Sequence, residues 1–145
     1  MARLLALVIG TTAALAFVTS ASAEQGSQAW LQPVTGEGTG RVILSPTAQE
    51  HGELYVQGQV EVEGVSPNAT MSVMRALFSD GTCTTITKPW ASVAPGSFTT
   101  SAGGAGTMHF IRDTSNLSGT TLYTEFRVSG GGDLLQTNCF SVFIK

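Results

Sequence analysis

Two histidines and two cysteines are the side chains of this 145-residue chain that could bind a metal ion or form a redox centre. They are His51, His109, Cys83 and Cys139, and each stands alone in the sequence. Structural zinc sites draw their ligands from close pairs of such residues. We therefore expect no metal site and no cofactor.

Hydrolase chemistry would need a nucleophile, a base and an orienting acid that the fold brings together. The chain contains no Gly-x-Ser-x-Gly motif, which presents a nucleophilic serine on a strained turn. His109 and Asp113 are close in sequence, but on a strand four residues of spacing separate them by about 13 Å, beyond hydrogen-bond reach. The pattern gives no catalytic triad.

Glu61 and Glu63 project from one face of the same expected strand, about 7 Å apart, which paired-carboxylate glycoside hydrolysis permits. Gln57 and Gln59 continue the same row, so a solvated face is the stronger interpretation. The glycines of residues 103–106 are not followed by a helix, as a phosphate-binding loop requires, and indicate a turn. We expect no enzyme.

The aromatic residues Trp30, Trp90 and Tyr123 are the remaining candidates for a ligand site. Both tryptophans fall outside the alternating segments, and Trp90 directly follows Lys88-Pro89. Exposed tryptophans on β-domains can stack on sugar rings or anchor protein partners. The alternative is that each tryptophan covers an end of the core. Arg75 has a weaker claim.

Residues 1–23 have the features of a secretory signal peptide: Arg3, an apolar run from Leu4 to Phe17, and the small-residue ending Ala21-Ser22-Ala23. We expect export to the periplasm or the extracellular space, with no membrane insertion after cleavage.

An oxidising compartment makes Cys83 and Cys139 candidates for one disulfide bond. A loop of this length would stabilise the fold by about 4 kcal/mol. Asn68 and Asn116 fit the N-glycosylation pattern, which matters only in a host that glycosylates.

Charge restricts the partners. Of the seven basic residues one, Arg3, lies in the leader, so residues 24–145 carry six basic and ten acidic side chains, a formal charge of −4. The basic residues are scattered singly, whereas nucleic-acid binding uses a clustered basic face. We expect a protein or glycan partner of unknown identity and no nucleic acid.

The elements that must position these residues are β-strands. Residues 24–40 are polar and glycine-rich and are expected to form a flexible lead-in to one domain, residues 41–145. The segment from Leu54 to Val62 alternates apolar and polar residues. Asp80-Gly81 predicts a two-residue hairpin, and the glycines of residues 102–106 predict another. The eight expected strands are residues 41–45, 54–62, 70–79, 82–87, 97–101, 107–111, 121–128 and 137–144.

Short strands separated by turns predict an all-β fold, an immunoglobulin-like or jelly-roll antiparallel β-sandwich of seven or eight strands, with a barrel as the second choice. The predicted function is a secreted, non-enzymatic surface-binding or structural interaction module. The alternative is a carbohydrate-binding protein or a carrier of a small apolar ligand that uses the tryptophans.

Overall fold

A computed structural model describes residues 27–48 and 53–144. The predicted signal peptide and His51 lie outside these residues. In the described part no helix is long and apolar enough to cross a membrane. The elements are β1 (Ser27–Thr35), β2 (Thr39–Ala48), β3 (Leu54–Glu63), β4 (Thr70–Phe78), β5 (Ile86–Thr99), β6 (Gly106–Asp113), the 3-10 turn η1 (Ser115–Leu117), β7 (Thr120–Gly130), β8 (Asp133–Thr137) and β9 (Phe140–Ile144).

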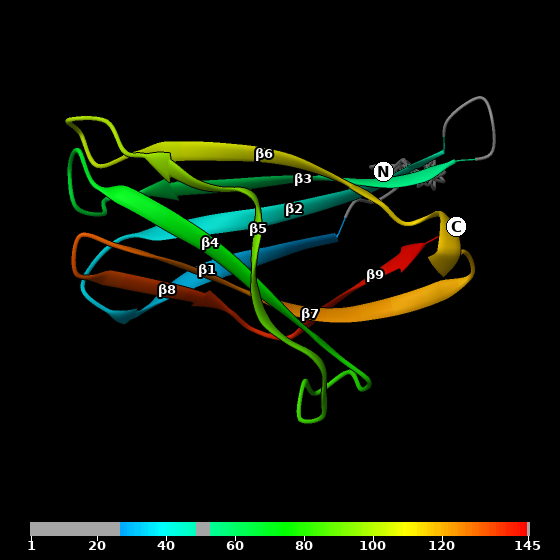
Figure 1. Cartoon of the computed structure of the whole chain (residues 1–145). Helices are drawn as coiled ribbons and strands as arrows, with labels where there is room; N and C mark the ends of the chain where they lie inside the picture. Colours follow the sequence, from blue (N-terminus) through cyan, green and yellow to red (C-terminus); the bar gives the residue numbers. More distant parts are fainter. Residues whose placement is uncertain (1–26, 49–52, 145) are drawn as a thin grey trace, which may run out of the picture.

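The strands form one antiparallel sheet that curls through 275° into an almost closed barrel (Figure 1). The order is β5-β4-β7-β8-β1-β2-β3-β6, and β9 pairs with β7 beside this path. The expected two-sheet sandwich is therefore wrong, although the all-β antiparallel class is confirmed. Alternation tells which side chains face inward, but not whether the inward faces belong to two sheets or to one curled sheet. Long-range pairs such as Leu31 with Thr137 decide that.

β1 corrects the expectation of a flexible lead-in over residues 24–40. Its residues pair with β2 on one side and with β8 on the other, so the strand lies within the sheet. Leu31 is fully buried in the core, while Gln28, Trp30 and Gln32 are exposed. A single buried apolar side chain gives no recognisable period, so this strand depends on its two neighbours rather than on its own pattern.

β3 confirms the predicted alternation. Val56, Gly58, Val60 and Val62 are buried, and the residues between them are half-buried or exposed. Packing explains why a glycine occupies position 58. A Cβ added to Gly58 would overlap the ring of Phe110 from the neighbouring strand β6. The inward face of β3 therefore belongs to the core throughout.

The predicted hairpin at Asp80-Gly81 exists, but its turn is longer. Phe78 pairs with Ile86, so residues 79–85 connect β4 to β5. The carboxylate of Asp80 accepts hydrogen bonds from the backbone N–H groups of Thr82, Thr84 and Thr85 at 3.1, 3.1 and 2.9 Å. These bonds replace the two-residue turn that the sequence favoured, because the Asp80 side chain supplies the acceptors.

Two strands extend past prolines, beyond the ends that we expected at residues 45 and 87. β2 continues through Pro46, and β5 continues through Pro89 and Pro95. Pro46 lies beyond the last described β1–β2 pair, Ser27 with Leu44, and β5 is an edge strand. A proline is tolerated in such places because one side of the strand makes no ladder.

One further expectation about a hairpin and one about a strand are wrong. Residues 97–101 and 107–111 do not pair with each other: β5 pairs with β4, and β6 pairs with β3. β5 and β6 are the two edges of the sheet, and the glycine-rich link between them crosses the opening of the barrel. The expected last strand, residues 137–144, is divided into β8 and β9, which pair with different parts of β7.

One end of the barrel, at the left in Figure 1, is closed by four connections that contact one another. Asp133, which is buried at the start of β8, is an acceptor for two of them: its carboxylate takes hydrogen bonds from the backbone N–H of Glu37 at 3.0 Å and of Ser66 at 2.6 Å. Ser66 in turn donates its hydroxyl to the carbonyl of Gly131 at 2.9 Å. The buried charge at this closed end is therefore satisfied by protein groups.

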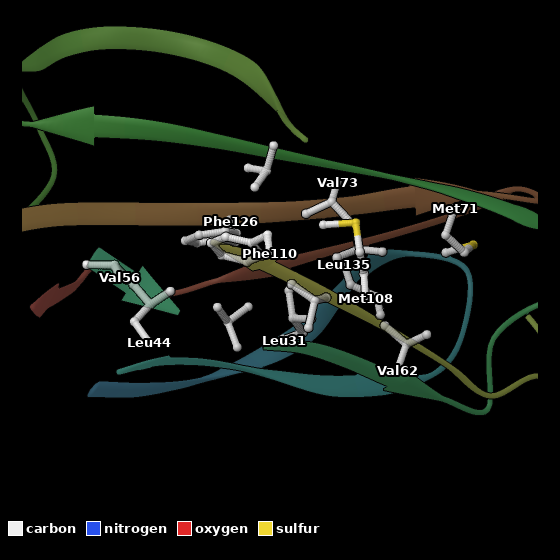
Figure 2. Packing of buried hydrophobic residues seen from close by; sticks show 14 of the residues in the cluster. Leu31, Leu44, Val56, Val62, Met71, Val73, Met108, Phe110, Phe126 and Leu135 are labelled. Carbon is white, nitrogen blue, oxygen red and sulfur yellow. The ribbon is translucent and has the colours of Figure 1, made fainter. Parts of the chain in front are cut away.

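The core fills the barrel along its length (Figure 2). Met71 and Val62 lie at one end of this cluster, and Leu44 and Val56 lie at the other. Its buried members are Leu31, Val42, Leu44, Val56, Val60, Val62, Val65, Met71, Val73, Val93, Met108, Phe110, Phe126, Val128, Leu135, Val142 and Ile144.

Candidate functional site

A cavity of about 400 Å³ extends from the core at the end of the barrel opposite Asp133. Its inner wall is the apolar end of the core, which includes Leu44, Val56, Phe110 and Phe126. The rings of Phe110 and Phe126 stack with centroids 6.0 Å apart. Side chains from β4, β5, β6, β7, β9 and η1 complete the wall, so the cavity is formed by the whole fold rather than by one loop.

Two arginines line this cavity from different strands. Arg75 lies on β4, in the inward phase of Met71 and Val73, and Arg112 lies on β6, in the inward phase of Met108 and Phe110. Both side chains are half-buried. The strands that carry them sit at or next to opposite edges of the sheet, so the curl of the barrel is what brings the two positive groups into one cavity.

Neither arginine has a carboxylate partner among the described residues. The Nε atom of Arg112 is buried and makes no hydrogen bond. Burial lowers the pKa of Arg75, and the positive charge of Arg112 lowers it further. Buried charges in proteins are normally paired or hydrogen-bonded, because desolvation otherwise costs several kcal/mol. The cavity thus holds two positively charged guanidinium groups, and no carboxylate of the described residues neutralises them.

Two more charged residues line the same cavity, Lys88 on β5 and Asp113 at the end of β6. The carboxylate of Asp113 already accepts hydrogen bonds from Ser115, from its backbone N–H at 2.9 Å and from its hydroxyl at 2.7 Å. These bonds lower the pKa of Asp113 and keep it ionised. Three positive groups against one engaged carboxylate leave the cavity positive, which favours an anionic guest.

The predicted disulfide is confirmed, and each of its cysteines precedes a segment that lines this cavity. Cys83 and Cys139 are bonded, with their Cα atoms 5.6 Å apart. Cys83 belongs to the connection that leads into Thr87 and Lys88 of the cavity wall, and Cys139 directly precedes β9, whose Val142 also lines the cavity. The bond therefore ties two parts of the cavity wall together.

A second hollow, of about 420 Å³, lies on the outside of the barrel over β1, β2, β3 and β6. Trp30, Arg41, Glu61 and Thr107 are among the residues that line it. The Nε of Arg41 and the Oε2 of Glu61 form an ion pair at 2.5 Å. Hydrogen bonding to Arg41 lowers the pKa of Glu61. This hollow shares no lining residue with the arginine cavity.

The three aromatic candidates lie in different surroundings. Trp30 lines the outer hollow, whereas the ring of Trp90 stacks on Arg127 of β7, whose guanidinium carbon is 4.0 Å from the ring centroid. Tyr123 lies beside Gly81, at which an added Cβ would be 3.4 Å from the tyrosine ring. Neither of the two cavities described here includes more than one of the three residues.

The polar candidates are also separated. His109 is exposed on β6, and Asp113 is bound to Ser115 rather than to a histidine. Glu61 is held by Arg41, so it is not a free partner for Glu63. Within residues 27–48 and 53–144 no three histidine, cysteine or acidic side chains gather as metal ligands would.

Arg112 was missed by the sequence reasoning, and Arg75 was ranked below the tryptophans. A signal for both was present. Each arginine continues the apolar phase of an alternating strand, at a position where a core side chain is expected. A charged residue in that phase is costly in a simple core and therefore marks a candidate site.

Comparisons of the chain with protein-family models, with curated proteins and with solved structures find no match.

Proposed function

We propose that this protein is a non-enzymatic binding protein that holds a small amphipathic anion in the arginine cavity. The observation that carries this proposal is the pair Arg75 and Arg112, two guanidinium groups in an apolar-walled cavity without a carboxylate partner in the described chain. A carboxylate, sulfonate or phosphate placed between them would supply the missing negative charge. Arginine suits this role because its planar group binds such anions through two parallel hydrogen bonds.

The ligand also needs an apolar part. Behind the arginines the wall is made of core side chains, among them Val56, Phe110 and Phe126. A hydrated inorganic anion would leave that wall in contact with water, whereas an alkyl or aryl group would cover it. At about 30 Å³ for one water volume, the cavity of about 400 Å³ holds on the order of a dozen non-hydrogen atoms. This size suits a medium-chain fatty acid or a small aromatic acid.

A carrier role is favoured over the surface-interaction module that the sequence suggested first. The large apolar side chains exposed on the outside are spread over four strands: Trp30, Val34, Ile86, Ile111 and Phe143. Protein interfaces instead collect such residues at one centre.

We propose further that the protein acts outside the cytoplasm, as the expected signal peptide of residues 1–23 implies. The Cys83–Cys139 bond supports this, because structural disulfides persist in oxidising compartments.

The test is calorimetric titration with decanoate and with 1-decanol, which share the alkyl chain and differ in the charged head group. We expect decanoate to bind with one site per chain and 1-decanol to bind at least tenfold more weakly. A hydrogen bond to a charged group contributes about 1.5–3 kcal/mol, which corresponds to a tenfold or greater difference in affinity. Phenylbutyrate serves as the aromatic counterpart.

Variants separate the cavity from general electrostatic attraction. Arg75→Met and Arg112→Met should each remove most of the preference for decanoate over 1-decanol. Arg112→Lys, which keeps the charge, should retain part of it. Arg41→Met is the matched control, because Arg41 lies on the outside of the barrel, and it should bind decanoate like the wild type. Equal affinity for the acid and the alcohol, or no binding of either acid, would contradict the proposal.

A further inference from the structure

The outer hollow over β1, β2, β3 and β6 is built as a row of side chains that crosses the strands. The pairing register places Trp30 beside Arg41, Arg41 beside Glu61, and Glu61 beside Thr107. At a spacing of about 4.8 Å per strand, the row from β1 to β6 extends over roughly 14 Å. Beside it the hollow is bounded by Thr39 and Glu63. It is therefore elongated across the sheet.

An aromatic face is exposed at one end of this row. Trp30 is 60% exposed on β1, although the next residue, Leu31, is fully buried. Trp30 pairs with Arg41 of β2, and the next residue, Leu31, is paired on both sides of β1, so the backbone holds the indole in a defined direction. Such a face binds the apolar C–H face of a sugar ring or another flat surface while its edge stays in water.

The polar part of the row is charge-balanced and rich in hydrogen-bonding groups. Arg41 and Glu61 neutralise each other, and the side-chain amide of Gln59 also donates to Glu61. Among the described residues only the Nε of Arg41 is hydrogen-bonded, to Glu61, so a ligand can use its terminal guanidinium nitrogens as donors. Thr107 adds a hydroxyl, and Glu63 adds a second carboxylate at the border. The lining thus has one positive and two negative groups, which disfavours an anionic ligand.

We propose that this hollow is a binding site for a neutral oligosaccharide. One sugar ring stacks on Trp30, and the hydroxyl groups of this ring and the next bind the Arg41–Glu61 pair and Thr107. A neutral polyol fits because it offers both donors and acceptors to a lining that presents both, and because it brings no charge to the carboxylates. The site shares no residue with the arginine cavity, so this proposal does not depend on the proposed anion carrier.

The experiment uses the two tryptophans of the chain as separate reporters. Trp90→Phe leaves Trp30 as the single tryptophan, and Trp30→Phe leaves Trp90, which lies on Arg127 away from the hollow. Each variant is titrated with neutral hexasaccharides of β-linked glucose, of β-linked xylose and of N-acetylglucosamine, and with hexagalacturonate as the anionic probe. We expect a saturable fluorescence change with at least one neutral probe in Trp90→Phe and none in Trp30→Phe.

Affinity is then measured by calorimetry with the neutral probe that binds. We expect Trp30→Ala to weaken binding at least tenfold, as removal of an anchoring aromatic contact does elsewhere. The double variant Arg41→Met/Glu61→Met should weaken it as well, whereas Arg75→Met in the inner cavity should leave it unchanged. Circular dichroism confirms that each variant is folded.

Three results would overturn the proposal. They are the absence of any saturable response to the neutral probes in Trp90→Phe, equal affinity of Trp30→Ala and the wild type, and tighter binding of hexagalacturonate than of the neutral hexasaccharides. None of these results would affect the decanoate test of the arginine cavity.

Discussion

Charged groups lie next to the core at both ends of this barrel, but their partners differ. At the closed end the carboxylate of Asp133 is buried and accepts backbone hydrogen bonds from Glu37 and Ser66. At the opposite end of the barrel, which we call the open end, Arg75 and Arg112 line an apolar-walled cavity. Neither arginine has a carboxylate partner among the described residues. Protein groups pair with the charge at the closed end, whereas no described carboxylate pairs with the charges at the open end.

The difference separates a structural charge from a pair of charges for which we propose a ligand. Asp133, at the start of β8, binds the two connections that contain Glu37 and Ser66, so its role is to hold the closed end together. The arginines make no such connection, so they do not explain the stability of the open end. A disulfide bond supplies that connection instead, since Cys83 and Cys139 tie β9 to the link before β5.

Removal of the disulfide should have the largest effect. Cys83→Ala/Cys139→Ala removes a bond between residues separated by 56 positions, and the chain-entropy model assigns such a bond about 4 kcal/mol. Urea unfolding of the double variant against the oxidised wild type measures this loss in the free energy of unfolding. Hydrogen exchange should increase most in residues 79–88 and 140–144, and less in the connections around Asp133.

Two controls accompany this measurement. The wild type unfolded in the presence of dithiothreitol should match the double variant, and Cys83→Ala alone should lose as much as both substitutions together, because one bond is removed in either case. A loss below about 1 kcal/mol, or faster exchange mainly at the closed end, would contradict the role assigned to the bond.

Replacement of a cavity arginine should stabilise the protein while it weakens the binding of decanoate. In Arg75→Met a half-buried charge beside Arg112 gives way to an apolar side chain, which removes both the desolvation of that charge and its repulsion from Arg112. Because Arg75 keeps part of its solvent contact, we expect about 1 kcal/mol. The readout is the midpoint of urea unfolding without ligand, and a clear decrease would mean that Arg75 has a structural partner.

The charge at the closed end should behave in the opposite way and should respond to pH. The backbone hydrogen bonds from Glu37 and Ser66 lower the pKa of Asp133 below its ordinary value of 3.8. A carboxyl group whose pKa is lower in the folded state stabilises the protein above its unfolded pKa, and this contribution is lost as pH falls through the folded value.

Asp133→Asn should therefore be less stable than the wild type at pH 7 and should lose less stability between pH 5 and pH 2. This effect should be the smallest of the three, because one group out of several acidic ones is changed. Asp113, which also has a lowered pKa, supplies the control: Asp113→Asn should leave the hydrogen-exchange protection of the closed end unchanged. An acid profile of Asp133→Asn identical to that of the wild type would show that Asp133 is not the shared acceptor in solution.

Both cavity arginines could have been found by a stricter use of the same alternation that predicted the strands. Arg75 follows Met71 and Val73 at a spacing of two, and Arg112 follows Met108 and Phe110 in the same way. What alternation could not tell is that these two positions lie in one cavity. They belong to β4 and β6, which have β7, β8, β1, β2 and β3 between them in the strand order.

The sequence by itself determined the inward and outward faces of β3 and the identity of the disulfide partners. Local alternation is enough to orient a strand, and two cysteines allow only one intramolecular bond. The tertiary structure decided the rest: β1 lies inside the sheet, the sheet curls into one barrel, and the arginines share a cavity. These features depend on pairs between distant residues, such as Leu31 with Thr137, and no local pattern carries information about them.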